Sequence, residues 1–253
     1  MVVAFFIVEE YFGKPPVERG DAASMENYVV QTFNRAIAEQ RLGCAAVALI
    51  HEGKISAEYG FGISTPGTTD SVNTQETLFL LSSLSKAVSA WGVMKLVENK
   101  KIGLDEPILP YLKRWQFPGS ERFRDKVTIR HLLSHTAGFQ DGYGHSGFAP
   151  GEKVQTIEEC LLMPADVNTG TPHPAVIVTE PGTMMSYSSA GYAVLQLLIE
   201  ELSGMPFSDY MQQEILDPLG MNHSTYSLDT VIARTDTNKL AANYDMEMKT
   251  HPH

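Results

Sequence analysis

Ser83 and Lys86 are the residues of this sequence whose types and spacing best suit nucleophilic catalysis. A serine hydroxyl is nearly unreactive until a neighbour accepts its proton, and a lysine can do this when burial or nearby charge lowers its pKa. Residues three apart share a face of a helix, so the two side chains should lie together if a helix begins here. The S-x-x-K spacing is common by chance, so its interpretation depends on the rest of the chain.

The stretch that follows Lys86 predicts such a helix. Its apolar residues recur at helical spacing: Ala90, Val93, Met94 and Val97. The N-terminus of a helix also adds positive potential and free N–H groups, which favour an oxyanion there. Ser85 is the alternative nucleophile, because it lies beside the pair.

Length and composition indicate a globular protein. The 253 residues are 43% hydrophobic, enough for one large domain or two small ones with a core. A net charge of −11 argues against nucleic acid or an anionic membrane as a partner. Two cysteines, Cys44 and Cys160, form neither a disulfide framework nor a metal-ligand pattern. The serine chemistry expected here needs no metal and no cofactor. Residues 1–8 are apolar but too short to span a membrane and make a poor signal peptide. They predict a strand, and the compartment stays open, with the cytoplasm slightly favoured.

The first 76 residues predict a helix packed on an antiparallel sheet. The helix is expected over about residues 25–41, with Val30, Phe33 and Ile37 on its apolar face. The apolar run 44–50 predicts a buried strand, which a turn at 51–54 joins to a second strand at 55–61 as a hairpin.

Residues 77–229 predict a mostly helical part. Thr128 can cap a short helix that ends near residue 134, residues 156–162 predict another, and residues 191–201 predict a longer one closed by Gly204. Pro206 suits the start of a further helix. The glycine-rich residues 141–151 predict a surface loop. Four acidic residues are expected on solvated helix faces: Glu158, Glu159, Glu200 and Glu201.

Three further stretches accompany the S-x-x-K motif. They are Thr77-Leu78-Phe79, the run TIRHLLSHTAGF at 128–139, and Glu180-Pro181-Gly182-Thr183 followed by YSSAGY at 187–192. With GLDEP at 103–107 between them, their order and spacing resemble the serine β-lactamase and penicillin-binding-protein-like hydrolases. The class C-like branch is the most similar; it also holds esterases, D-amino-acid peptidases and acyltransferases. The resemblance covers about residues 25–244. It implies an α/β fold of the β-lactamase/transpeptidase type, with an antiparallel sheet flanked by helices and a mostly helical subdomain.

The resemblance also implies roles for individual residues. Ser83 matches the acylated nucleophile, Lys86 the base that activates it, and Tyr187 the tyrosine of the family's Y-x-N motif, which relays protons. Acyl transfer needs one proton taken from the serine and one given to the departing group. A lysine and a tyrosine can carry out these two transfers, so the chemistry of the residues agrees with the implied roles. The backbone N–H of Ser83 would supply half of an oxyanion hole. Ser189 and Tyr143 are the candidate substrate-binding residues.

Two departures from the family pattern affect the expected activity. Ser189 stands where the family usually has Asn, which disfavours β-lactamase activity but leaves esterase or acyltransferase chemistry open. The family's third motif, K-T-G or H-x-G, has no counterpart. Lys249-Thr250-His251 comes too early in the chain, and His145-Ser146-Gly147 precedes Tyr187.

The end of the sequence predicts an incomplete sheet. Residues 240–245 resemble the family's passage out of the helical region, and the remaining strands are expected from a C-terminal part or a second chain, with a curtailed fold as the alternative. We therefore expect residues 1–76 to form the N-terminal part of the sheet domain and 77–229 the helical subdomain. Residues 230–253 would then be a return segment.

The leading hypothesis is a serine hydrolase that forms an acyl-enzyme on Ser83 and acts on small esters or amides. Acyl transfer to a small alcohol or amine is the second hypothesis. A catalytically incomplete chain that acts only with a partner is the third. His131 and His135 are interpreted as structural, while Trp115 could line the cleft or belong to the core.

Overall fold

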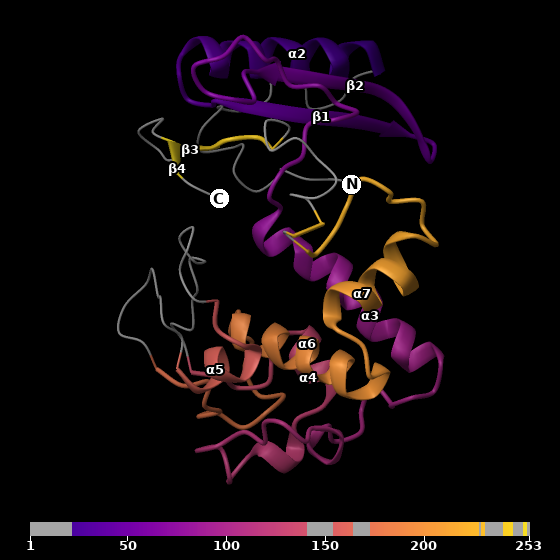
Figure 1. The fold of residues 1–253 in the computed structure, drawn as a ribbon, viewed down its shortest axis with the longest axis vertical. Coiled ribbons are helices and arrows are strands. Elements are labelled where there is room, and N and C mark those ends of the chain that lie inside the picture. The colour runs from indigo at the N-terminus through magenta and orange to yellow at the C-terminus, as the bar shows by residue number, and fades with distance from the viewer. Residues whose placement is uncertain are drawn as a thin grey trace. The chain divides into compact units, whose positions relative to one another are not determined.

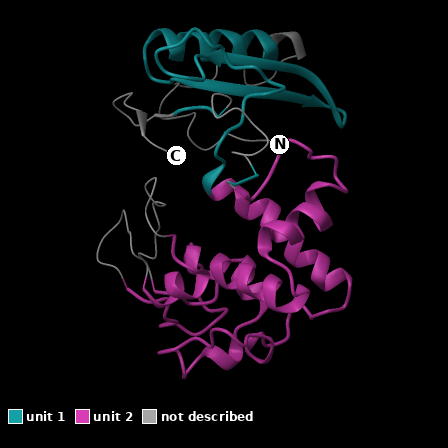
Figure 2. Cartoon of the chain, in the orientation of Figure 1, with its two compact units in different colours: residues 1–82, 229–253 teal, residues 83–228 magenta. Residues whose placement is uncertain are grey.

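The computed structural model describes residues 22–140, 154–163, 173–227, 229–230, 240–244 and 250–251. The chain divides into two compact units, residues 1–82 with 229–253 and residues 83–228 (Figure 2). The strand predicted at residues 2–8 and the loop predicted at 141–151 lie outside the described residues.

The first unit is built on one helix and one hairpin. Helix α2 (Ala22–Ala38) packs on the antiparallel strands β1 (Cys44–His51) and β2 (Lys54–Gly62) (Figure 1). Phe33 of the helix stacks on Phe61 of β2, with ring centroids 5.1 Å apart. The predicted helix and hairpin are confirmed, although the helix ends three residues before the predicted position.

The burial predicted for the first strand is wrong. None of the β1 side chains is fully buried, and Ile50 and, on the partner strand, Ile55 are 47% and 61% exposed. Among the described residues this sheet has two strands, in the order β1-β2. One helix can cover one face of such a ribbon, so an apolar run here is left half-exposed.

The chain returns to the first unit near residue 240. The backbone N–H of Ala241 donates to the carbonyl of Leu78 at 2.8 Å, and that of Ala242 donates to the carbonyl of Ser64 at 2.8 Å. Two short strands follow, β3 (Asn243–Tyr244) and β4 (Thr250–His251), paired antiparallel with each other.

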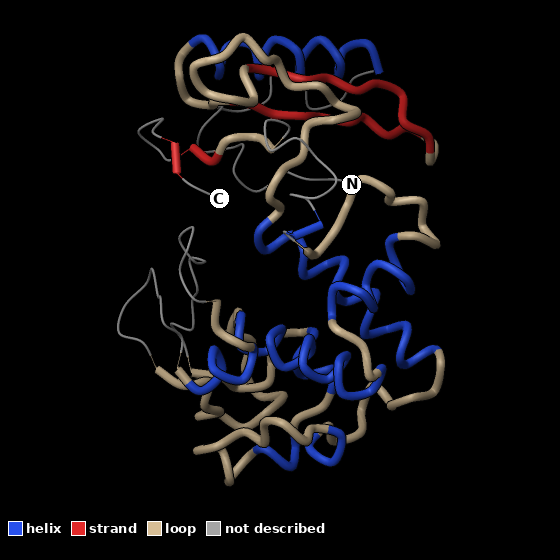
Figure 3. The backbone as a smooth tube through the Cα atoms, viewed as in Figure 1, coloured by secondary structure: helices blue, strands red, loops and turns tan. Residues whose placement is uncertain are grey.

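Helices and loops make up the described part of the second unit (Figure 3). In chain order they are η1 (Ser82–Leu84, which straddles the boundary), α3 (Ser85–Glu98), η2 (Leu109–Tyr111), η3 (Arg124–Lys126), α4 (Ile129–Leu133), α5 (Ile157–Leu162), α6 (Ser189–Ser203), α7 (Phe207–Met211) and the π-helical turn η4 (Gln212–Leu216). Helix α6 is the central element, since it packs against α3, α4, α5 and α7 and buries seven residues. No helix among the described residues is long and apolar enough to cross a membrane.

Side chains of Thr and Ser cap the starts of α4, α5 and α6, and the cap at Thr128 is the one that the sequence predicts. Thr128 and Thr156 each form a capping box, with His131 and Glu159 as their partners three residues on. Ser188 Oγ accepts the N–H of Gly191 at 3.1 Å, so α6 begins two residues earlier than predicted.

The buried face of α3 differs from the apolar repeat that predicts the helix. Gly92, Val93 and Leu96 are buried, whereas Met94 is 40% exposed. A Cβ atom at Gly92 would meet the sulfur of Met211, so the glycine permits the close approach of α3 to α7. Packing against α6 and α7 therefore selects the buried face, which the apolar repeat alone does not define.

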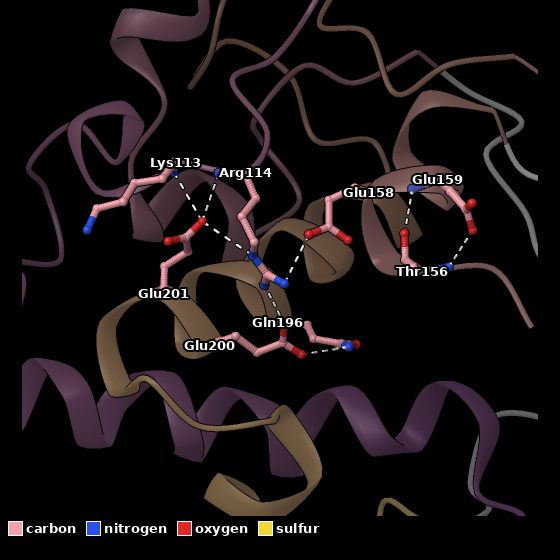
Figure 4. A network of polar contacts seen from close by, with 8 residues as sticks. All are labelled: Lys113, Arg114, Thr156, Glu158, Glu159, Gln196, Glu200 and Glu201. Carbon is pink, nitrogen blue, oxygen red and sulfur yellow. Dashed lines mark hydrogen bonds and ion pairs between the residues drawn. The ribbon is translucent and has the colours of Figure 1, made fainter.

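An ion-pair network joins the segment after η2 to α5 and α6 (Figure 4). Arg114 lies between three carboxylates: its Nη1 is 3.0 Å from Glu158, its Nε is 3.4 Å from Glu201, and its Nη2 contacts Glu200. Glu201 also accepts the backbone N–H of Arg114 at 2.9 Å. The expectation that these carboxylates lie on solvated faces is wrong, because the fold brings two helices to one arginine that the sequence places far away.

Gly138 allows two irregular segments to pair beside α4 and α6. Its φ is 83°, and a Cβ atom there would meet the carbonyl oxygen of Thr179. Its own carbonyl accepts the N–H groups of Val178 and Thr179 at 2.9 and 3.2 Å. Residues 135–140 are thereby held against residues 176–186.

We expect Gly138→Ala to lower the free energy of unfolding by about 2 kcal/mol or more. The alanine would have to adopt a left-handed φ, and its Cβ would also clash with the carbonyl oxygen of Thr179, so the two costs add. Gly204→Ala is the matched control: its φ is 72° but open space surrounds it, so about 1 kcal/mol from φ alone is expected. Urea unfolding midpoints measure both. Equal losses in the two variants would contradict the close approach at Gly138.

Candidate active site

The structure brings Ser83 and Lys86 together. Lys86 Nζ donates a hydrogen bond to Ser83 Oγ at 3.2 Å. Ser83 lies in η1 and Lys86 in the first turn of α3, and Leu84 between them has helical φ and ψ, so the three-residue spacing still puts both on one face. The amine therefore contacts Ser83 and leaves Ser85, the alternative nucleophile, less favoured.

The backbone immediately before Ser83 is strained. Ser82 has a φ of 43°, a left-handed conformation that costs roughly 1–3 kcal/mol in residues other than glycine. Such strain persists where the surrounding structure enforces it, and it often marks functional sites. The side chain of Ser83 is exposed, as a nucleophile requires.

Tyr187 lies beside the amine of Lys86. The Nζ atom is 5.0 Å from the centroid of the Tyr187 ring and 5.7 Å from that of Tyr192. Burial acts to raise the pKa of Tyr187, but hydrogen bonds from Lys86 and Ser83 and the charge of Lys86 outweigh it and leave the pKa below its ordinary value. Ionisation of the Tyr187 phenol next to the serine hydroxyl is therefore easier here than in a free tyrosine.

His135 holds the chain on both sides of Tyr187. Its Nδ1 accepts the N–H of Ser188 at 3.0 Å, and its carbonyl accepts the N–H of Ser186 at 2.8 Å. Its ring lies 4.5 Å from the Tyr187 ring and 5.3 Å from the Tyr192 ring. Because Nδ1 is an acceptor, the neutral ring carries its proton on Nε2. This arrangement supports the structural interpretation of His135.

His131 also has a structural partner. Its Nδ1 accepts the N–H of Thr128 at 3.3 Å, which completes the capping box of α4. The nitrogen is therefore engaged in starting the helix, and this supports the interpretation of His131 as structural.

Of the other residues predicted for the site or its cleft, the structure describes Ser189 and Trp115. Ser189 is the first residue of α6, and its side chain is half-buried. Tyr143 and the His145-Ser146-Gly147 stretch lie outside the described residues. Trp115 is 4% exposed and packs on Phe117 with ring centroids 4.6 Å apart, so it belongs to the core. The substrate-binding roles of Ser189 and Tyr143 stay predictions.

Tyr192 is a residue of the site that the sequence does not single out. It lies in the first turns of α6, five residues after Tyr187, and its ring contacts both Lys86 and His135. The YSSAGY stretch contains it, but an aromatic residue next to a helix start is usually only packing. Within the described residues, no group of three or more His, Cys, Asp or Glu side chains could hold a metal ion.

A Beta-lactamase family profile matches residues 29–248. The chain belongs to the β-lactamase family. It is 28% identical over 223 residues to Penicillin-binding protein 4* of Bacillus subtilis (strain 168), a match that covers 88% of this chain and 47% of that protein. The chain therefore spans about half the length of this curated relative.

Solved structures agree with this membership and with the predicted fold class. The octameric penicillin-binding protein homologue from Pyrococcus abyssi is 28% identical with a TM-score of 0.70, over 92% of this chain and 50% of that one. EstCE1, a hydrolase with promiscuous acyltransferase activity, is 25% identical with a TM-score of 0.67, over 91% and 59%. The β-lactamase/transpeptidase-like fold is thus confirmed.

Protonation of His135 should destabilise the folded chain. Burial and the charge of Lys86 lower its pKa below the ordinary 6.5. The unfolded chain therefore binds the proton more readily than the folded chain does. The stability that the neutral ring of His135 gives the folded chain is fully present above about pH 6.5. It is lost as the pH falls through the lowered folded-state pKa.

Urea unfolding at a series of pH values measures how the free energy of unfolding changes with pH. In His135→Gln this free energy should fall less steeply as the pH is lowered than it does in the unaltered protein. The control is His51→Gln, whose side chain is 71% exposed and should leave the slope unchanged. The same slope in His135→Gln as in the unaltered protein would contradict the role of the neutral ring.

Proposed function

We propose that this chain carries the nucleophile and the proton-transfer groups of a serine hydrolase that acts on small esters or amides through an acyl-enzyme on Ser83. The observation that carries the proposal is the 3.2 Å hydrogen bond from Lys86 to Ser83. Tyr187 lies beside this pair, and the pKa of its phenol is lowered. Family membership supports this reading.

The first half-reaction acylates the serine. Ser83 Oγ attacks the carbonyl carbon, its proton passes to Tyr187 or to Lys86 in its neutral form, and the carbonyl electron pair moves onto oxygen. The backbone N–H of Ser83 would provide one donor to that oxyanion. When the intermediate collapses, the bond to the alcohol or amine breaks, and this departing group takes the proton from Tyr187 or Lys86. The acyl group stays on the serine.

The second half-reaction releases the acyl group. Water takes the place of the departing group, and Tyr187 or Lys86 accepts its proton as the new carbon–oxygen bond forms. The Ser83–acyl bond then breaks, and the proton returns to Ser83 Oγ. The lowered pKa of Tyr187 suits this double use, because it makes the phenolate that accepts each proton easier to form.

We further propose that a sheet segment outside this chain faces the serine and supplies the second oxyanion donor. The described hairpin has two strands, and helix α2 packs on it but leaves the side chains of Ile50 and Ile55 about half-exposed, so a further sheet segment would have apolar surface to cover. A further part of the polypeptide or a second subunit could provide the strands. The archaeal relative is octameric, which makes a second subunit a reasonable source.

Acyl transfer to an alcohol or amine is the second candidate function. It uses the same acyl-enzyme and differs only in the acceptor that replaces water. EstCE1, described as a hydrolase with promiscuous acyltransferase activity, favours this candidate. Product analysis with a small alcohol present separates the two, since transfer yields a new ester and hydrolysis yields only the acid.

A fluorophosphonate probe should label the purified protein at Ser83. Ser83→Ala should abolish labelling and lower ester hydrolysis by about 10³-fold or more, because removal of a catalytic nucleophile costs several orders of magnitude. Ser85→Ala is the matched control and should still be labelled, as mass spectrometry of the tryptic peptides can show. Equal labelling of Ser83→Ala and the unaltered protein would refute the mechanism.

Lys86→Met should raise the pKa of Tyr187, because it removes the hydrogen bond and the charge that lower it. Difference absorbance of tyrosinate between each protein and its Tyr187→Phe counterpart isolates this residue. Lys95→Met is the control on the same helix, since Lys95 pairs with Glu98 at 2.8 Å. A titration of Tyr187 that is the same with and without Lys86 would exclude the proposed coupling.

A further inference from the structure

The start of helix α3 lacks the side-chain cap that α4, α5 and α6 have. Its N-cap residue is Leu84, which makes no side-chain hydrogen bond, whereas Thr128, Thr156 and Ser188 cap α4, α5 and α6. An uncapped first turn tends to fray. This turn nonetheless carries Lys86, whose reach to Ser83 depends on the position of the backbone between them.

A hydroxyl cluster holds this first turn from a distant part of the chain. Tyr226 Oη donates to the carbonyl oxygen of Ser85 at 2.8 Å. Ser89 Oγ lies 2.9 Å from the same carbonyl and 3.1 Å from Tyr226 Oη. Since the tyrosine proton is used on the carbonyl, the serine hydroxyl donates either to the carbonyl or to the phenol oxygen.

Tyr226 is well suited to act as a fixed donor. Its ring packs edge-on against Phe207 at the start of α7, with centroids 5.0 Å apart and planes at 79°. Burial raises its pKa, although its hydrogen bond with Ser89 acts in the opposite direction, so the phenol keeps its proton at neutral pH. Tyr226 is 141 residues away from Ser85 in the sequence, so it ties the first turn of α3 to the α7 region of the same unit.

We propose that Tyr226 is a positioning residue for the Ser83–Lys86 pair, and that its hydrogen bond to the Ser85 carbonyl fixes the first turn of α3 in the geometry that lets Lys86 reach Ser83. Ser85 lies between the two side chains of the pair, so a shift of its peptide changes their separation directly. Small displacements of catalytic groups have large effects on rate. This inference rests on the proposed function.

The test compares Tyr226→Phe with Tyr210→Phe. Tyr210 Oη donates to the carbonyl of Gly92 on the same helix at 3.0 Å, so both variants lose a phenol bond to an α3 carbonyl and keep the ring. Tyr226→Phe should lower the limiting rate of fluorophosphonate acylation by about 3- to 10-fold, with the half-saturating probe concentration unchanged. Tyr210→Phe should lower the melting temperature but leave the acylation rate as it is.

A second variant and a second measurement complete the test. Ser89→Ala removes the other hydroxyl of the cluster without altering the Tyr226 ring, and it should slow acylation in the same direction but by less. Hydrogen exchange followed by mass spectrometry should show faster exchange over residues 83–89 in Tyr226→Phe and unchanged exchange over the second half of α3.

The outcomes separate this inference from the proposed function. Unchanged acylation in both Tyr226→Phe and Ser89→Ala, or an equal loss in Tyr210→Phe, would overturn the positioning role. If the unaltered protein takes no label, or Ser83→Ala labels equally, the proposed function fails. Hydrogen exchange in Tyr226→Phe still tests, in that case, whether Tyr226 holds the first turn of α3. Unchanged exchange over residues 83–89 overturns this role, and faster exchange confined to these residues supports it.

Discussion

The contact between Lys86 and Ser83 is the interaction on which the described site depends. The amine lies 3.2 Å from the serine hydroxyl and faces the rings of Tyr187 and Tyr192. Its charge also acts on the titration of its neighbours, since it lowers the pKa of both Tyr187 and His135. The same cation thereby makes the phenolate of Tyr187, the candidate proton acceptor, easier to form and favours the neutral form of the structural imidazole of His135.

The rest of the second unit holds three chain segments around this amine. Helix α6, buried on most of its surface, sets the place of Tyr192 and, through Ser188 at its cap, the end of the segment that carries Tyr187. His135 fixes that segment from the other side with a ring nitrogen and a carbonyl. The first turn of α3 is held by Tyr226. The restraints from His135 and Tyr226 link positions far apart in sequence, so the geometry of the site depends on the packed unit as a whole.

The first unit combines a helix, a hairpin and a segment that returns near residue 240. Its helix and hairpin pack through Val29, Ala36 and the Phe33–Phe61 stack, and residues 240–242 return to hydrogen-bond beside residues 64 and 78. Yet Ile50 and Ile55 stay about half-exposed. Exposed apolar positions on a two-stranded ribbon are the expected consequence when further strands or another surface are needed to cover it.

Local signals in the sequence determined the elements and the family. Helix starts follow from Thr128, Thr156 and Pro206, the end of α6 from Gly204, and the pairing of Ser83 with Lys86 from a three-residue spacing, because all of these depend on contacts within one or two turns of chain. Motif order was sufficient to place the chain in the β-lactamase family.

Tertiary structure decided what those signals leave open. It showed which face of α3 is buried, that Glu158, Glu200 and Glu201 surround Arg114, and that β1 is half-exposed. It also brought Tyr192 to Lys86, His135 to Tyr187 and Tyr226 to the carbonyl of Ser85. These features arise from contacts between residues many positions apart, and a single sequence carries no local pattern that records which distant side chains will meet.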